Sequence, residues 1–215
     1  MASQKNTARA VIDEAGGPLS RRAGIRLADR PAPLWQLLVL VNLLSARISA
    51  GIAVAAAREL NAAGGTTPRG MAGLTWQQRV DALGRGHYVR YDESTATRLG
   101  ECARMVLDDY GGDLRRLGAA AGGSRGRLEE ALRRFPGIGP TGAAMFCREA
   151  QEVWPWLRPY TDRRARDGAA RLGLPESEAR LGALVPGQDT AAFAAGLAAA
   201  ARDDALIARI RAAAA

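Results

Sequence analysis

The chain has almost no lysine. Of its 30 lysine and arginine residues, only Lys5 is a lysine. Arginine stays protonated in proteins and cannot serve as an amine nucleophile. A mechanism that passes through a Schiff base therefore has only Lys5 or the terminal amine as candidates.

Histidine and cysteine are also scarce. The sequence has one histidine, His87, and two cysteines, Cys102 and Cys147, which lie far apart. This spacing excludes a zinc or iron–sulfur site built from cysteines alone. Isolated cysteines in helical patterns are typical of buried free thiols in a reducing compartment.

Long hydrophobic runs are missing as well. The longest, from Leu34 to Leu44, contains Gln36 and Asn42 and is too short to span a bilayer. The N-terminal residues include charged side chains and lack an apolar signal core. We expect a cytoplasmic protein with no membrane partner.

The residues that are abundant favour helices and a polyanionic partner. Hydrophobic residues make up 47% of the chain and aromatic residues only 5%. The formal net charge is +8, which suits nucleic acid. A generally basic, arginine-rich composition would give the same charge, so charge alone leaves the partner open.

Helix start signals recur along the chain. Ser49 and Ser94 precede amphipathic stretches, and Thr75 with Gln78 forms a capping box. Asp162 precedes a helical stretch that ends near Leu172, with Gly173 as its C-cap. No strand pattern or internal repeat is found, so the sequence predicts an all-α fold.

The segment from Phe135 to Phe146 is the most informative. Gly137 and Gly139 flank one apolar residue, Ile138, and Pro140 suits the first position of a new helix. Such a hairpin exposes backbone N–H groups and the positive end of a helix, which together can bind a phosphate. An ordinary corner between two helices is the alternative.

The segment from Phe135 to Pro175 resembles the helix–hairpin–helix (HhH-GPD) DNA glycosylases of the endonuclease III superfamily. The resemblance rests on the hairpin Phe135-Pro136-Gly137-Ile138-Gly139, on Asp162 and on the helix end Arg171-Leu172-Gly173-Leu174. Upstream, Leu43 to Arg47 and Gly86-His87-Tyr88 are weaker matches. The resemblance extends over residues 35–175.

This resemblance implies two helical lobes with a cleft between them. One lobe would be a helical barrel of residues 48–134. The other would combine residues 1–47 with 135–215 and contain the helix–hairpin–helix at 135–150. The partner would be double-stranded DNA, with the target nucleotide turned out of the stack. We expect a monomer.

The resemblance also implies that Asp162 is the catalytic carboxylate. Cleavage of an N-glycosidic bond builds positive charge on the sugar, and a carboxylate stabilises that charge and engages water. Asp162 also opens a helix, so an N-cap role is the alternative, and the two roles are compatible.

Two departures from the family pattern matter. Bifunctional members carry a lysine where this chain has Thr141, which predicts a monofunctional glycosylase. No cysteine follows Cys147, so the iron–sulfur cluster of the endonuclease III branch is expected to be absent. A non-catalytic DNA-binding protein, and a glycosylase with weak lyase activity through Lys5 or the terminal amine, are the alternatives.

The resemblance assigns further residues. Arg47 stands where relatives fill the gap left by the flipped base, although a phosphate contact or a solvated helix end is the alternative. Glu149 and Glu152 are expected to be solvated or paired with Arg148. The resemblance also suggests a site for a monovalent cation at the hairpin carbonyls. The predicted DNA-binding set is Gly137, Ile138, Gly139, Thr141, Gly142, Arg47, Arg163 and Arg164, and the candidate base-pocket aromatics are His87, Tyr88, Tyr91, Trp154 and Trp156.

Overall fold

The structure is a computed structural model that describes residues 2–215, and it contains helices but no β-strand within that range. The all-α prediction is confirmed. The α-helices are α1 (Ala2–Glu14), α2 (Leu19–Arg22), α3 (Pro31–Leu44), α4 (Ala50–Leu60), α5 (Pro68–Gly73), α6 (Trp76–Arg85), α7 (Asp92–Tyr110), α8 (Arg115–Ala120), α9 (Arg125–Leu132), α10 (Pro140–Ala150), α11 (Arg163–Arg171), α12 (Glu178–Gly182), α13 (Thr190–Ala200) and α14 (Asp204–Ala214).

The chain divides into two compact units. The central unit comprises residues 23–146, and the terminal unit combines the N-terminal segment up to Arg22 with residues 147–215. This division differs from the predicted lobes, because residues 23–47 and 135–146 lie in the central unit. Helix α10 begins among residues of the central unit and ends among those of the terminal unit.

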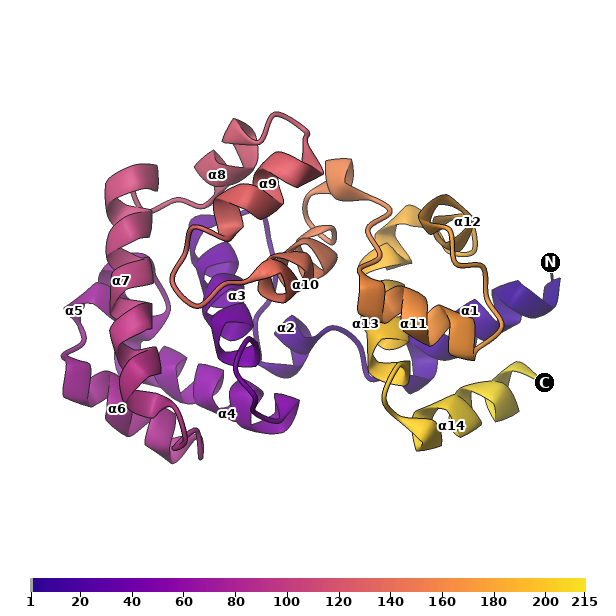
Figure 1. The fold of residues 1–215 in the computed structure, drawn as a ribbon, viewed down its shortest axis with the longest axis horizontal. Coiled ribbons are helices and arrows are strands. Elements are labelled where there is room, and N and C mark those ends of the chain that lie inside the picture. Colours follow the sequence, from indigo (N-terminus) through magenta and orange to yellow (C-terminus); the bar gives the residue numbers. More distant parts are fainter. Residues whose placement is uncertain (1) are drawn as a thin grey trace. The chain divides into compact units, whose positions relative to one another are not determined.

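Helix α3 is the core helix of the central unit. Almost every position from Leu34 to Leu43 is buried, as expected for a helix that is apolar on all sides. Trp35 is fully buried and donates its indole N–H to the Gly65 carbonyl at 2.9 Å. This bond fixes α3 against the segment that follows α4 (Figure 1).

A buried arginine joins α5, α6 and α7. Arg79, 8% exposed, donates to the carbonyls of Leu74 at 2.6 Å, Ala96 at 2.8 Å and Met71 at 3.1 Å. Burial, with the charge of Arg104, lowers the pKa of this guanidinium. Because three carbonyls satisfy the charge, no carboxylate is needed beside it.

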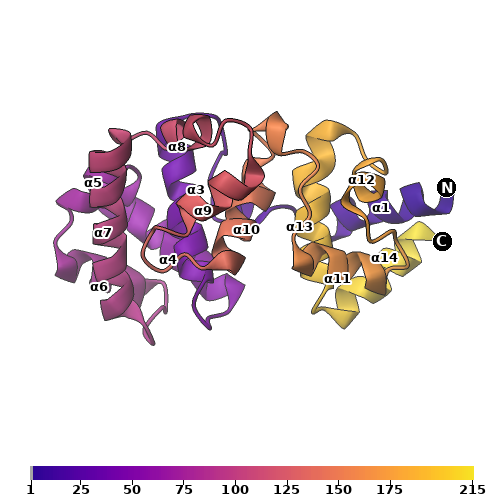
Figure 2. The same ribbon diagram turned by 45° about the horizontal axis from the view of Figure 1, so that its top comes forward.

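The terminal unit is built around α13. Its core packs α1, α11, α13 and α14 together, as Figures 1 and 2 show. At Gly168 a Cβ atom would lie 1.9 Å from the Leu197 carbonyl oxygen, so α11 and α13 approach as closely as they do because this residue is glycine. The largest apolar side chain of this core is Phe193.

Most predicted helix starts are confirmed. Ser49 accepts from the Ile52 amide, and Thr75 and Gln78 form the complete capping box. Gly173, at φ +68°, follows α11 in a Schellman arrangement in which the Leu174 amide donates to the Ala169 carbonyl.

Other local predictions are wrong. Helix α7 begins at Asp92 rather than after Ser94. The short helices α2, α5, α8 and α12 begin at none of the start signals identified in the sequence.

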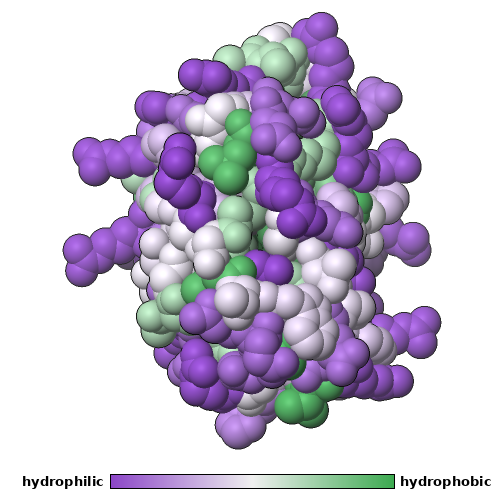
Figure 3. Space-filling model, turned by 90° about the vertical axis from the view of Figure 1, so that its left-hand side faces the viewer, coloured by the Kyte–Doolittle hydropathy of each residue, from purple (hydrophilic) through white to green (hydrophobic). Residues whose placement is uncertain are grey.

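The face of the molecule seen in Figure 3 is mainly polar. On the face in Figure 3, hydrophilic side chains project outward and hydrophobic atoms form small separate areas. Among residues 2–215, the exposed large hydrophobic side chains are those of Trp76 and Val89. Within residues 2–215, no helix combines the length and apolarity needed to cross a membrane.

Candidate functional site

The hairpin buries its apolar side chains and exposes its glycines. Phe135 and Ile138 are buried, at 1% and 4% exposure, whereas Gly137 and Gly139 are exposed. The Ile138 amide donates to the Phe135 carbonyl at 3.0 Å and closes the turn. Ile138 therefore anchors the hairpin with both its side chain and its amide.

The hairpin rests on polar groups from α3 and α7. Asn42 Nδ2 donates to the Pro136 carbonyl at 2.7 Å, and Cys102 Sγ donates to the same oxygen at 3.4 Å. Gly137 has φ +84°, and a Cβ there would meet the Asn42 amide at 3.0 to 3.1 Å and Arg98 Cδ at 3.1 Å. The left-handed backbone conformation favours glycine at 137, and a Cβ there would also crowd the side chains of Asn42 and Arg98.

The start of α10 offers free backbone donors. The first amide of α10 bonded in the helical pattern is that of Ala143, which donates to the Gly139 carbonyl at 2.9 Å. The amides of Thr141 and Gly142 precede it and have no intrahelical acceptor. Thr141 is exposed and Gly142 is buried against Ser45 and Ile138, so an anion would reach this helix end from the Gly139–Thr141 side.

The hairpin carbonyls are partly used already. The Pro136 oxygen accepts two hydrogen bonds, and those of Phe135 and Gly139 accept one each. Two acceptor sites per carbonyl leave Pro136 with no capacity for a cation. The monovalent cation stays a prediction and would depend chiefly on the Gly137 and Ile138 carbonyls.

Asp162 lies at the start of α11 with both carboxylate oxygens engaged. Oδ1 accepts from the Ala165 amide at 2.8 Å, which makes Asp162 the N-cap. Oδ2 accepts from Arg148 Nη1 at 2.5 Å, and the two side chains are only 7% and 4% exposed. The cap alternative raised from the sequence is therefore present, together with a buried ion pair that the sequence did not predict.

Polar atoms beside this carboxylate lack partners. Arg148 Nε and Thr161 Oγ1 are buried and make no hydrogen bond within the described chain. Arg164 lies close by, and burial together with the charges of Arg202 and Arg148 lowers the pKa of its guanidinium. A carboxylate and several arginines thus share one partly buried region of the terminal unit.

The prediction for Glu149 is wrong. Its carboxylate is 3% exposed and accepts from the Ser20 hydroxyl at 2.6 Å, the Ser20 amide at 3.1 Å and the Leu19 amide at 3.2 Å. Glu149 is therefore neither solvated nor paired with Arg148, because it binds the start of α2. Glu152 is half-buried, and burial raises the pKa of its carboxyl while the charge of Arg21 lowers it.

The predicted surface arginines differ in exposure. Arg47 is exposed in the loop between α3 and α4 and makes no hydrogen bond or ion pair to any other residue of the range 2–215. Arg163 is exposed at the start of α11, and Arg164 is half-buried. Arg47 and Arg163 are thus available to a partner.

The candidate base-pocket residues need correction. Tyr88 is fully buried and its hydroxyl donates to the Leu43 carbonyl at 3.2 Å, so it is a core residue of the central unit. Trp154 is buried too, stacked on half-buried Trp156 with centroids 5.9 Å apart. Neither Tyr88 nor Trp154 presents a ring face to an open pocket.

His87 and Tyr91 remain accessible. His87 is exposed and has the left-handed value φ +61°, and half-buried Tyr91 lies under the Arg90 guanidinium at 5.2 Å. A base could therefore reach the His87 side chain, whereas one face of the Tyr91 ring is already covered.

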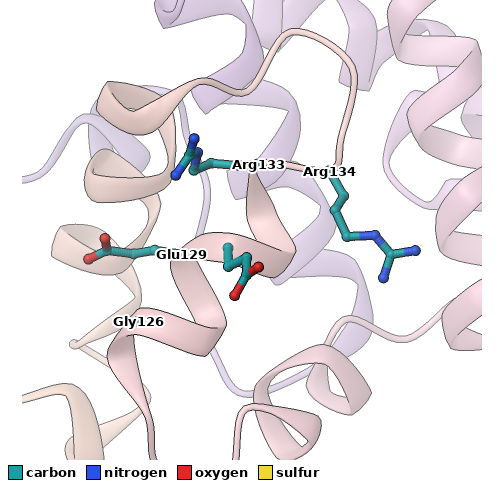
Figure 4. A pocket seen from close by; sticks show the side chains of 5 residues that line it. Gly126, Glu129, Arg133 and Arg134 are labelled. Carbon is teal, nitrogen blue, oxygen red and sulfur yellow. The ribbon is translucent and has the colours of Figure 1, made fainter.

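Two hollows lie on α7, α8 and α9, and none of the predicted DNA-binding, catalytic or base-pocket residues is among the residues that line them. One, of about 470 Å³, is lined by Gly126, Glu129, Glu130, Arg133 and Arg134. Figure 4 shows Arg133 and Arg134 leaving the chain in different directions, so they do not converge on one ligand. The second, of about 290 Å³, includes Tyr110 and Arg127. Among the described residues, no group of three or more histidine, cysteine or acidic side chains could hold a metal ion.

No protein-family model matches the sequence. No curated protein matches it either. Among solved structures, the chain is similar to the one described as "Structure of a Trapped Endonuclease III-DNA Covalent Intermediate: Estranged-Adenine Complex". The TM-score is 0.48 and the identity 15%, over 90% of this chain and 84% of that chain.

Proposed function

We propose that the protein is a monofunctional DNA glycosylase that hydrolyses the N-glycosidic bond of a damaged or mispaired base in double-stranded DNA. The observation that carries the proposal is the hairpin. Its apolar residues Phe135 and Ile138 are buried, while Gly137, Gly139 and Thr141 are exposed.

Such a surface suits a DNA phosphate. Backbone N–H groups at a helix start donate to phosphate oxygens, and the helix dipole favours the negative charge. A contact between backbone amides and a phosphate involves no base edge. It would therefore position the protein on the duplex without selecting a base sequence. Arg47, exposed in the same unit as the hairpin, would add positive charge to this surface, and exposed Arg163 would add positive charge beside Asp162 in the terminal unit.

Asp162 would supply the negative charge at the reacting sugar. Each carboxylate oxygen has two acceptor sites, so the bonds from Ala165 and Arg148 leave one site on each oxygen. A remaining site would stabilise the oxocarbenium-like sugar and accept a proton from the attacking water. The N-cap role of Asp162 is compatible with this chemistry.

The reaction would proceed without a covalent enzyme intermediate. By the resemblance stated above, Thr141 stands where bifunctional DNA glycosylases carry a lysine, and a threonine cannot form a Schiff base. Borohydride trapping on abasic DNA tests this point. We expect no covalent adduct, and an adduct lost on replacing Lys5 would instead support a weak lyase activity.

The decisive experiment is a panel of duplexes, each with one alkylated, deaminated or mismatched base, scored for released free base. We expect release from at least one duplex, and none by Asp162→Asn, which should bind that duplex with nearly unchanged affinity. Excision by Asp162→Asn at the wild-type rate would refute the role of this carboxylate.

A second candidate is a non-catalytic DNA-binding protein. The specific observation in its favour is that Asp162 caps α11 and pairs with Arg148 in a buried setting, which is a sufficient structural role. If the panel yields no free base while duplex binding falls steeply with salt, this candidate replaces the first.

A further inference from the structure

We propose that Arg148 is a positioning residue for Asp162 and holds its carboxylate in the orientation that the reaction needs. The proposal rests on the proposed glycosylase function. It assigns a role in the reaction to a residue that touches the carboxylate rather than the DNA.

The contact between the two side chains is close and shielded. Arg148 Nη1 lies 2.5 Å from Asp162 Oδ2, with side-chain exposures of 4% and 7%. Charge-assisted bonds of this kind are stronger than neutral ones and favour one geometry. The Ala165 amide holds the other oxygen at 2.8 Å, so the carboxylate is fixed at both ends and cannot rotate without breaking a bond.

The two residues come from segments of different character. Arg148 lies in the last turn of α10, whereas Asp162 ends a connection of 12 residues (151–162) between α10 and α11 that contains the 3-10 turn Pro155–Leu157. A regular helix is a firmer support than a connecting segment. Arg148 can therefore transmit the position of α10 to the carboxylate.

Other observations point to more than a stabilising ion pair. Arg148 Nε is buried without a partner, although a guanidinium selected only for stability would be expected to satisfy all its donors. Arg164 adds another positive charge near Arg148, which disfavours the cluster electrostatically. The chain retains this costly arrangement next to the one carboxylate assigned to the chemistry.

The experiment compares Arg148→Lys and Arg148→Met in single-turnover excision and in DNA affinity, with the duplex that the wild-type protein cleaves. For Arg148→Met, we expect the excision rate to fall at least tenfold and the Kd to change less than threefold. Arg148→Lys keeps a charged donor and should recover part of the rate.

The matched control is Arg171→Met. Arg171 also pairs with an aspartate of the terminal unit, Asp204, and donates to the Ala200 carbonyl at 2.8 Å, but it does not contact Asp162. Thermal unfolding and near-ultraviolet circular dichroism establish the folded fraction of each variant. The Arg171 variant should excise within twofold of the wild-type rate after correction for that fraction.

The remaining outcomes of this experiment would overturn the positioning role of Arg148. Equal rates for folded Arg148→Met and wild type overturn the positioning role, as does a faster Arg148→Met, which would mean that the arginine restrains Asp162. If Arg148→Met does not fold, Arg148→Lys alone decides, and a loss shared equally between rate and affinity overturns the role. If the wild-type protein releases no base from any duplex, the proposed function itself fails, and the role of Arg148 fails with it.

Discussion

Asn42, near the C-terminal end of the buried helix α3, donates from Nδ2 to the carbonyl oxygen of Pro136 at 2.7 Å. Asn42 is 2% exposed, and its Oδ1 atom lacks a partner within the described chain. A polar side chain in such a helix costs free energy unless its hydrogen bonds are made. The arrangement therefore ties the conformation of the hairpin to the core of the central unit.

Replacing Asn42 with Leu should weaken DNA binding without slowing the chemistry of bound DNA. Removal of the donor leaves the Pro136 carbonyl short of one bond, at a cost of about 1–3 kcal/mol. If about 1.4 kcal/mol of this falls on the hairpin conformation that binds phosphate, the Kd rises about tenfold. Fluorescence anisotropy measures the Kd, and single-turnover excision at saturating protein measures the rate.

Gln36→Leu is the matched control for this variant. Gln36 lies on the same helix and also donates to a carbonyl, that of Thr66 at 3.2 Å, but not to the hairpin. It should lose stability and keep its DNA affinity. Equal losses of affinity in the two variants would contradict a specific link between Asn42 and the hairpin.

The two hairpin glycines should respond differently to alanine. Gly137 has φ +84° and touches Asn42 and Arg98, so Gly137→Ala should lower the free energy of unfolding by about 1–3 kcal/mol. Gly139 lacks a positive φ and has open space where its Cβ would lie, so Gly139→Ala should cost about 0 kcal/mol. Urea unfolding checks both, and similar losses would show that the hairpin has another conformation in solution.

The sequence predicted features that depend on a few neighbouring residues. The capping box at Thr75, the cap at Ser49 and the end of α11 at Gly173 each need only residues within one turn of a helix. The hairpin belongs to this class, because its glycines and Pro140 are adjacent. The preference of helix N-termini for serine gave the wrong start for α7. It favoured Ser94 as the N-cap, but the N-cap in the structure is Tyr91.

Contacts between distant segments could not be predicted in this way. Glu149 binds Ser20 across 129 positions of the sequence, and Asp162 binds Arg148 across 14. The sequence instead suggested that Glu149 and Glu152 are solvated or paired with Arg148. Tyr88 illustrates the same limit, because an aromatic residue in a glycine-flanked turn can equally be a pocket wall or, as found, a fully buried core residue.

Cys102 should make the protein less stable in alkaline solution. Burial, with a smaller effect of Glu101, raises the pKa of the Cys102 thiol to about 12, while an unfolded thiol titrates near about 8.5. Between these values the folded state binds more protons than the unfolded state, so the free energy of unfolding falls as pH rises. The loss from pH 7.5 to 9.5 should reach about 1.4 kcal/mol for this thiol.

Urea unfolding at the two pH values, for the wild type and for Cys102→Ala, isolates this effect. Between pH 7.5 and 9.5, the free energy of unfolding of Cys102→Ala should fall by about 1.4 kcal/mol less than that of the wild type. The other titrating groups are common to both proteins and cancel in this comparison. Parallel changes in the two proteins would mean that the thiol is accessible to water in the folded state.

Thr161→Val should stabilise the protein and slow base excision. Thr161 is 6% exposed and its hydroxyl makes no hydrogen bond within residues 2–215, so valine removes a buried polar group and should raise stability by up to about 1 kcal/mol. A hydroxyl retained at such a cost beside Asp162 is expected to serve the reaction.

Thr190→Val is the control, since Thr190 is also 6% exposed but donates to the Gly187 carbonyl at 2.8 Å. That variant should lose about 1 kcal/mol and keep its excision rate once corrected for the folded fraction. A Thr161→Val protein that is more stable and excises at the wild-type rate would show that the hydroxyl has no part in the reaction.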